Sequence, residues 1–339
     1  MKKFWNSTRR WLPGVLISLV VIVLVLWLVG PGRLVNAFRG ADYRLILLAL
    51  LTSWTWLAVR GIVWRTLLRN KASYKQVFST LCEGYMLNNF LPLRLGELGR
   101  AFLLGRKASL PFMEVLSTIV IERALDVAFT VIVLLLSVPF VVGATSAKQL
   151  AILIGIVVVV GLVVLYWLAR NPDRALGVFN RLTARWPKVQ DLGGRFLAPL
   201  FSGLAILTDG WLFLRALLWM TLNWILGVAQ FYITVLAFFP HAPFAWAMFG
   251  LSGAALAGAI PSAPGGVGVY EAGFVAALTL VSHDSASSLA IAIITHVFNY
   301  AMTGALGGYF LSTEGETLMS VYRQLRRRQE GDLPPARPS

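Results

Sequence analysis

Residues 88–104 read NNFLPLRLGELGRAFLL, and residues 257–274 read AGAIPSAPGGVGVYEAGF. Each stretch places proline and glycine in the middle of an otherwise apolar region, 77–105 in the first case and 245–281 in the second. The apolar halves are about 10 to 16 residues long, too short to cross a hydrocarbon core about 30 Å thick but long enough to reach its middle and return. We therefore predict two re-entrant hairpins, each made of two half-helices.

The rest of the chain contains uninterrupted apolar runs long enough to span a bilayer. Of the 339 residues, 58% are hydrophobic and only 13% are charged, which excludes a water-soluble protein. We predict an all-α integral membrane protein with six full transmembrane helices in addition to the two hairpins. The six spans are expected at residues 12–30, 45–64, 113–138, 150–169, 211–239 and 287–311.

The distribution of basic residues predicts the orientation. If both hairpins return to the side from which they enter, 21 Lys and Arg residues flank the membrane on one side and 4 on the other. Cytoplasmic flanks carry the excess of positive charge, so both termini are expected in the cytoplasm. The hairpins then enter from opposite sides, and each break is followed by a glutamate, Glu97 or Glu271. This pattern is typical of inverted repeats with a substrate site at the midplane.

Residues 1–312 are expected to form a single polytopic domain. Within it, residues 170–210 are expected either as an amphipathic helix along the inner leaflet or as an ordinary cytoplasmic loop. The tail, 313–339, is basic and proline-rich, and we expect it to be disordered and to touch anionic lipid.

Several ionised side chains fall inside the hydrophobic regions. They are Glu83, Arg94, Glu97, Arg100, Glu122, Arg123, Asp126 and Glu271. Facing lipid, they would together cost about 20 kcal/mol, more than the stability of a typical domain. We therefore expect them to face one another, backbone dipoles or a water-filled cavity.

Helical spacing predicts how these charges pair. Arg94, Glu97 and Arg100 follow at intervals of three residues, so the glutamate would lie between two arginines on one half-helix. In the span 113–138, Arg123 is placed to pair with Asp126, which leaves Glu122 for an arginine of the first hairpin. One interpretation is that these ion pairs only fix helix register. Their position beside broken helices favours a binding or transport path.

The second hairpin suggests anion binding. Gly265, Gly266 and Gly268 precede a half-helix, where exposed backbone N–H groups and the helix dipole favour a phosphate. Alternatively, these glycines only make a tight turn. Other candidate cavity-lining residues are Asn89, Tyr270, His296 and Asn299; the last two share a helical face and could instead form interhelical hydrogen bonds.

The sequence offers little for metal, redox or nucleic-acid chemistry. One cysteine, Cys82, excludes a disulfide framework, and the three histidines form no ligand cluster, so no metal and no cofactor is expected. The net charge of +15 lies mostly in short loops, and no nucleic-acid partner is expected.

At three ordered motifs the chain resembles the lysylphosphatidylglycerol synthase transmembrane region, a flippase-like membrane protein family. The motifs are NNFLPLRLGELGRA, IERALDV and PSAPGGVGVYE, within roughly residues 10–312. The resemblance implies movement of an anionic or aminoacylated lipid between leaflets, with some relatives serving polyprenyl-linked glycans. Full-length synthases continue into a soluble aminoacyltransferase domain. Only a short tail follows residue 312 here, so we do not expect lipid aminoacylation.

These observations predict a lipid flippase or transporter of the bacterial cytoplasmic (inner) membrane. Arg94, Arg100 and Arg123 and the glycine turn would bind a phosphate-bearing headgroup. The residues expected to balance charge or carry protons are Glu97, Glu122, Asp126 and Glu271. The alternatives are an ion-coupled transporter of a small anion and a non-transporting partner of a lipid synthase. An enzyme is not expected, because Glu122 and Asp126 are the only acid–base candidates and no nucleophile–base pattern accompanies them.

Overall fold

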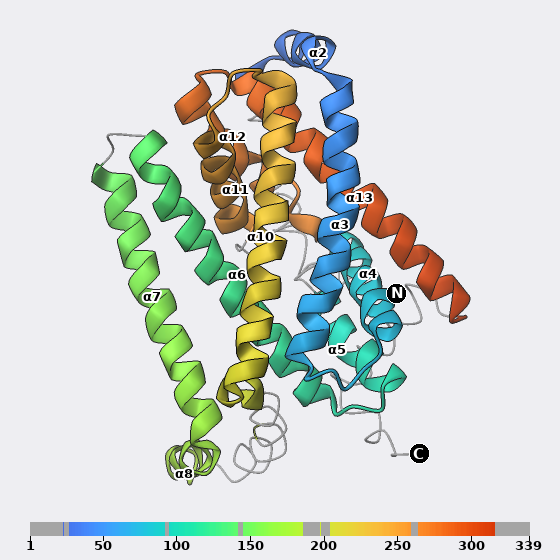
Figure 1. Cartoon of the computed structure of the whole chain (residues 1–339), viewed down its shortest axis with the longest axis vertical. Helices are drawn as coiled ribbons and strands as arrows, with labels where there is room; N and C mark the ends of the chain where they lie inside the picture. The colour runs from blue at the N-terminus through green and yellow to red at the C-terminus, as the bar shows by residue number, and fades with distance from the viewer. Residues whose placement is uncertain are drawn as a thin grey trace.

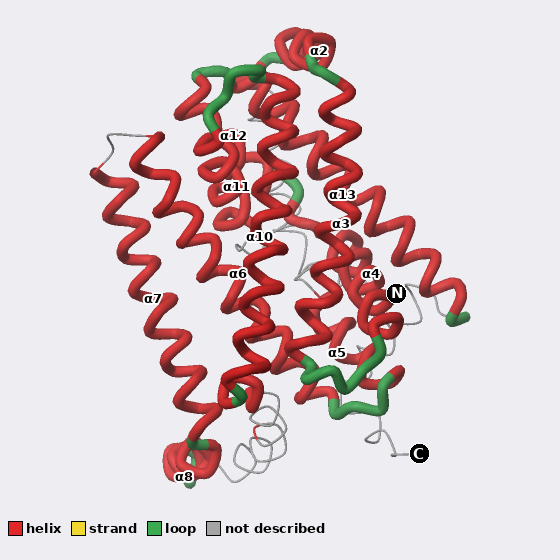
Figure 2. Tube along the Cα trace, viewed as in Figure 1, coloured by secondary structure: helices red, strands yellow, loops and turns green. Residues whose placement is uncertain are grey.

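A computed structural model describes residues 23, 27–91, 95–141, 145–185, 197, 204–258 and 264–315. Within these residues every regular element is a helix (Figure 2). Polar side chains begin several of them: Asp42 accepts a hydrogen bond from the Arg44 N–H at 2.8 Å, and Asp284 accepts one from the Ala286 N–H at 2.9 Å. The helices are α2 (Pro31–Gly40), α3 (Tyr43–Leu67), α4 (Tyr74–Phe90), α5 (Leu95–Lys107), α6 (Phe112–Val141), α7 (Thr145–Arg170), α8 (Pro172–Leu182), η2 (Ala205–Thr208), α10 (Gly210–Phe238), α11 (Phe244–Gly258), η3 (Pro264–Gly266), α12 (Val269–Ser282) and α13 (Ser285–Thr313).

Four helices in the described part are long and apolar enough to cross a membrane, namely α3, α6, α10 and α13. They cover four of the predicted spans. The predicted span 150–169 lies within α7, whose apolar part passes the same test only together with α8, bent from it by 100°. The predicted span 12–30 lies mainly outside the described residues.

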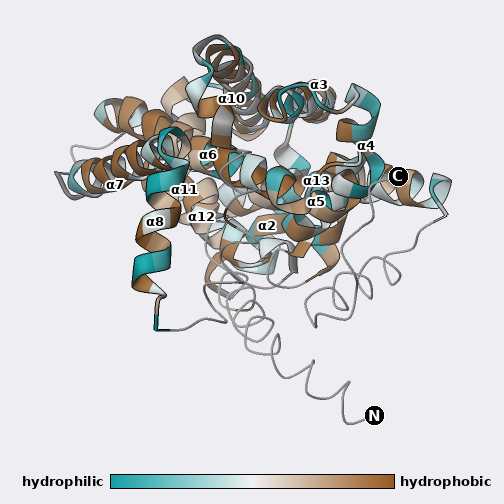
Figure 3. Cartoon of the chain, turned by 90° about the horizontal axis from the view of Figure 1, so that it is seen from below, coloured by the Kyte–Doolittle hydropathy of each residue, from teal (hydrophilic) through white to brown (hydrophobic). Residues whose placement is uncertain are grey.

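The outward faces of the long helices are apolar, as expected for a bilayer-facing surface. Leu136 on α6, Val160 on α7 and Leu218 on α10 are all more than half exposed. Figure 3 shows α7 mainly in the hydrophobic colour, whereas α8 alternates hydrophilic and hydrophobic positions. An exposed apolar surface of this extent would make a monomer in water aggregate. The protein is therefore a multi-pass membrane protein.

Two pairs of short helices, α4 with α5 and α11 with α12, lie at opposite ends of the bundle. In Figure 1, α4 and α5 lie in the lower half and α11 and α12 in the upper half. α4 and α5 are antiparallel, since Gln76 at the start of α4 donates to the carbonyl of Lys107 at the end of α5 (2.7 Å). A Cβ at Gly84 would lie 2.0 Å from Arg100 Cγ, so this position accepts only glycine. The proline-containing breaks at 92–94 and 259–263 lie outside the described residues.

The order of the helices gives two equivalent units, α3–α6 and α10–α13, each a long helix, two short helices and a long helix. α3 packs against α10 across the division, and the first short helix of each unit packs against the last long helix of the other, α4 on α13 and α11 on α6. Exchanging the two units leaves this set of contacts unchanged. α3 and α10 also begin at opposite ends of the bundle (Figure 1), as the predicted inverted repeat requires.

Two further segments were predicted outside the bundle, residues 170–210 and the tail 313–339. The helix expected within 170–210 appears as α8, whose Ala175 belongs to a buried apolar cluster with residues of α3, α6 and α10. Its place at the inner leaflet stays a prediction. The tail that we predict to be disordered lies outside the described residues from position 316 onward.

Candidate functional site

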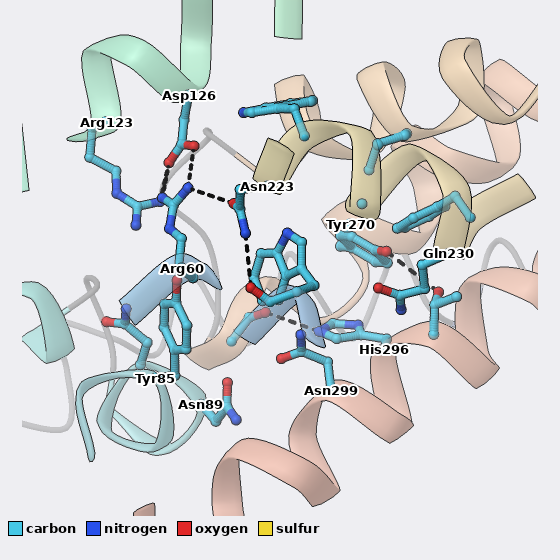
Figure 4. Close-up of a pocket in the computed structure, with 18 residues that line it drawn as sticks. Arg60, Tyr85, Asn89, Arg123, Asp126, Asn223, Gln230, Tyr270, His296 and Asn299 are labelled. Carbon is cyan, nitrogen blue, oxygen red and sulfur yellow. Dashed lines mark hydrogen bonds and ion pairs between the residues drawn. The ribbon is translucent and has the colours of Figure 1, made fainter. Parts of the chain in front are cut away.

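A pocket of about 350 Å³ lies between the two pairs of short helices (Figure 4). Helices of both units contribute to it, together with the η3 turn. Its lining residues are Trp56, Arg60, Tyr85, Asn88, Asn89, Arg123, Asp126, Asn223, Trp224, Gly227, Gln230, Phe231, Leu251, Gly265, Tyr270, Thr295, His296 and Asn299. In Figure 4 the charged groups gather at one end, with His296 and Tyr270 at the other.

Glu122 on α6 is the centre of the charged end. It is fully buried and contacts three guanidinium groups: Arg60 Nη2 at 2.8 Å, Arg100 Nη2 at 2.8 Å and Arg123 Nη2 at 3.0 Å. The contact with Arg100, on α5, confirms the predicted pairing of Glu122 with an arginine of the first hairpin. Glu122 is not left free by Arg123, however, since Arg123 approaches Glu122 as well as Asp126 (3.3 Å).

Arg60 is a site residue that was not predicted from the sequence. Its side chain is 3% exposed, forms a two-pronged ion pair with Asp126 and also contacts Glu122. Asn223 on α10 accepts from Arg60 Nη1 at 3.3 Å and donates to the carbonyl of Trp56 at 2.9 Å. An arginine in the middle of an apolar span was the available signal, but its partners lie more than 60 residues away in sequence.

Glu97 was predicted to pair with Arg94 and Arg100 on one half-helix, but Glu97 and Arg100 have other partners. Arg100 is fully buried, with its guanidinium 4.0 Å from the centre of the Trp64 ring and its charge directed at Glu122. Glu97 instead contacts Arg123 Nε at 3.4 Å. α6 therefore supplies the partners of both residues, because their side chains are directed across to the neighbouring helix. Arg94 lies outside the described residues.

Arg123 is the most accessible of the three arginines. Its side chain is 35% exposed, whereas Arg60 and Arg100 are at 3% and 0%. It also lines the pocket. The cluster pairs three guanidinium groups with the three carboxylates of Glu97, Glu122 and Asp126. Because Arg123 is the most exposed of these arginines, it has the most room to contact an incoming anion.

The glycine turn of the second hairpin borders the other end of the pocket. Gly265, Gly266 and Gly268 all have positive φ (68°, 76° and 87°), a conformation that favours glycine. A Cβ at Gly265 would lie 1.4 Å from the Tyr300 hydroxyl oxygen. The Gly268 N–H donates to Glu271 Oε2 at 2.7 Å, so a phosphate would have to displace this carboxylate to use that amide.

Glu271, expected to balance charge or carry a proton, contacts a histidine. Its Oε1 forms a short contact with His296 Nδ1, and His296 Nε2 lies 3.2 Å from the carbonyl oxygen of Gly265. The ring of His296 lies between those of Tyr270 and Tyr300, with both centroid distances at 4.6 Å. His296 thus both lines the pocket and bonds between helices.

The chain matches the lysylphosphatidylglycerol synthase TM region over residues 12–307. It belongs to this family. Two UPF0104 membrane proteins of Methanothermobacter thermautotrophicus are similar along almost their whole length: one is 24% identical, with 91% of this chain and 94% of the relative aligned, and the other 25% identical, with 90% and 97% aligned. A UPF0104 membrane protein of Pyrococcus horikoshii is 28% identical over 44% of this chain and 47% of its own. No solved structure matches.

The geometry divides the predicted site residues of this family member into two groups. The first group lines the pocket and comprises Asn89, Arg123, Asp126, Gly265, Tyr270, His296 and Asn299. The second group does not line it but supports those residues, and comprises Glu97, Arg100, Glu122, Gly268 and Glu271. Gly266 follows Gly265 in the η3 turn.

Proposed function

We propose that this protein is a flippase-like transporter that moves an anionic, phosphate-bearing lipid between the leaflets of the membrane. The lipid would be of the phospholipid, aminoacyl-phospholipid or polyprenyl-phosphate type. One observation carries the proposal: a pocket lined by helices of both units contains a partly exposed arginine, Arg123, held in place by the carboxylates of Glu122 and Asp126. Membership of a lipid-related transmembrane family supports the same substrate class.

The chemistry of the pocket suits a headgroup rather than a whole lipid. A volume of about 350 Å³ is at the small end of ligand pockets, enough for a phosphate with its attached polar group. The acyl or prenyl chains would stay in the bilayer beside the apolar helix faces. A guanidinium can donate two parallel hydrogen bonds to a phosphate. We therefore assign the first contact with the headgroup to Arg123, with Arg60 behind it and Glu122 fixing both.

The proposed topology follows from the inverted repeat. The pairs α4/α5 and α11/α12 would enter from opposite leaflets, with both termini in the cytoplasm of a bacterial cell, and so give the pocket access to each side in turn. Thiol labelling of single introduced cysteines tests this arrangement. The native Cys82 is fully buried and contributes little background. A cysteine at Arg33 should react from outside, and one at Lys71 from the cytoplasm.

Reconstitution into vesicles tests the transport proposal. We expect headgroup-dependent translocation of labelled phosphatidylglycerol over phosphatidylcholine, and a loss of about tenfold or more in Arg123→Gln, as expected for a charge-assisted hydrogen bond of about 1.5 to 3 kcal/mol. Arg215→Gln, which changes an exposed arginine that does not line the pocket, is the matched control.

The same assay separates the alternatives. Flux of free inorganic phosphate without lipid translocation would identify a small-anion transporter. If neither lipid nor phosphate moves, and deletion of the gene alters lipid synthesis, the protein is a non-transporting partner of a lipid synthase. Mass spectrometry of the recovered lipid should show it chemically unchanged; a modified lipid would identify an enzyme instead.

A further inference from the structure

The two units place equivalent residues at equivalent positions. Glu97 is the third residue of α5, and Glu271 is the third residue of α12. Arg123 is the twelfth residue of α6, and its counterpart at the twelfth position of α13 is His296. In each unit these two positions are in contact, Glu97 with Arg123 and Glu271 with His296. The pair Glu271–His296 is therefore the counterpart of Glu97–Arg123.

The counterparts differ in how their charge responds to pH. A guanidinium stays charged at every physiological pH, whereas an imidazole gains and loses a proton near neutrality. The other charged positions of the first unit have uncharged counterparts in the second. Arg60 on α3 corresponds to Gly227 on α10, and Asp126 on α6 corresponds to Asn299 on α13. Within these matched positions, the second unit keeps a single pair of ionisable residues, Glu271 and His296.

The hydrogen bonds of His296 require an additional proton on this pair. One ring nitrogen faces a carboxylate oxygen of Glu271 and the other faces the carbonyl oxygen of Gly265. A carbonyl oxygen only accepts, so Nε2 must carry a hydrogen. Nδ1 and Glu271 Oε1 then also share a proton, held either by the imidazole or by the carboxyl group. With that proton removed, one of the two contacts would bring together two acceptors.

The surroundings of the pair contain few other ionisable groups. Tyr270 and Tyr300 flank the ring, from α12 and α13. Across the pocket, the charged or titratable lining groups are Tyr85 on α4, Arg60 on α3, and Arg123 and Asp126 on α6. The pocket-lining residues of α10 and α11, among them Asn223, Gln230 and Leu251, are uncharged. The pocket therefore joins this pair to the arginine cluster.

Charge balance links a proton on the pair to an anion in the pocket. In the described residues the three arginines of the cluster are balanced by three carboxylates, so ionised Glu271 beside a neutral His296 leaves one negative charge in excess. One added proton removes that excess before an anion arrives. Because linkage is reciprocal, the anion in turn favours the proton.

We propose that Glu271 and His296 form the proton-binding site of this protein, which takes up one proton together with its anionic cargo. The proton enters the Nδ1–carboxylate contact and allows His296 Nε2–H to donate to the Gly265 carbonyl; its release breaks that hydrogen bond and frees the glycine turn. No covalent bond is made or broken apart from the N–H or O–H bond of the proton itself. The coupling to cargo rests on the proposed transport function, whereas the proton site does not.

Histidine NMR tests the site without any transport. In protein carrying His241→Gln and His283→Asn, which replace two exposed histidines, His296 is the remaining histidine. We expect one protonation step, and an upward shift of its midpoint when glycerol phosphate is added. Arg123→Gln should abolish the shift, and Glu271→Gln should alter the midpoint itself. A signal that does not titrate, or that ignores glycerol phosphate at every concentration, overturns the proposal.

Vesicle transport tests the coupling. In the wild type, phosphatidylglycerol translocation should fall by up to about tenfold per pH unit above the His296 midpoint, as one linked proton requires. His296→Arg, which copies the permanent charge of the other unit, should translocate with a flat pH profile, while His283→Asn should keep the wild-type profile. An unchanged slope in His296→Arg refutes the coupling but leaves lipid transport standing. If the NMR signal of His296 titrates and responds to glycerol phosphate but the protein moves no lipid, the transport proposal is refuted and the proton site stands. If His296→Arg misfolds, the NMR experiment decides.

Discussion

The change Glu122→Gln should destabilise the fold severely, although the two side chains have nearly the same shape. Glu122 contacts Arg60, Arg100 and Arg123 at 2.8 to 3.0 Å, and the first two arginines are almost completely buried. Removing one partner of a buried ion pair costs about 3 to 5 kcal/mol, because the remaining charge is left without compensation. Asp126 still compensates Arg60, so the loss falls mainly on Arg100.

Glu97→Gln provides the matched comparison. Glu97 is 24% exposed and contacts an arginine that is itself 35% exposed, at 3.4 Å. Partly solvated pairs of this kind contribute about 0 to 1 kcal/mol. Glu97→Gln should therefore leave stability nearly unchanged, although it removes one of the carboxylates that hold Arg123 and should weaken transport.

Reversible unfolding in mixed micelles with increasing SDS measures both free energies of unfolding. Adding Arg100→Met to Glu122→Gln should recover part of the loss, since replacing a whole buried pair by apolar groups is often neutral. If Glu122→Gln costs no more than Glu97→Gln, or if Arg100→Met lowers stability further, the arginines do not depend on Glu122 and the account of the cluster is wrong.

Two further substitutions probe the rest of the pocket. Gly265→Ala should destabilise by more than about 1 kcal/mol, because Gly265 has positive φ and its Cβ would overlap the Tyr300 hydroxyl. Gly304→Ala, in a helix with open space around it, should be neutral or stabilising in the same SDS titration; equal losses would argue against the tight turn. Asn223→Leu removes the hydrogen bonds to Trp56 and Arg60 and should cost about 1 kcal/mol, at roughly 0.6 kcal/mol for each interhelical hydrogen bond. An unchanged free energy of unfolding would show that Asn223 does not join α3 to α10.

The spans were predictable because hydrophobic length is a local property of the sequence. Runs at 45–64, 113–138, 211–239 and 287–311 become α3, α6, α10 and α13. The short helix pairs were also signalled locally, by proline and glycine inside apolar regions. α2 was not predicted: it occupies a region treated only as a loop between two spans, although Pro31 at its first position is a common helix start.

The pairing of charges was predictable only in part, because it depends on how separate helices face one another. Spacing along one helix correctly brought Glu122 to the first hairpin. It could not show that Arg60 approaches the same carboxylates from α3, or that Glu271 meets His296 rather than an arginine. The alignment of the two units, which puts Arg123 and His296 at the same helix position, required the observed helix starts.

The crossed packing of the two units has a consequence for biosynthesis. α4 packs against α13, which is synthesised after the other described helices, and α11 packs against α6 of the earlier unit. α4 and α5 therefore lack this support until the second unit has been inserted. Neither half of the polypeptide is expected to mature alone, and two fragments divided between α8 and α10 should accumulate only when they are produced in the same cell.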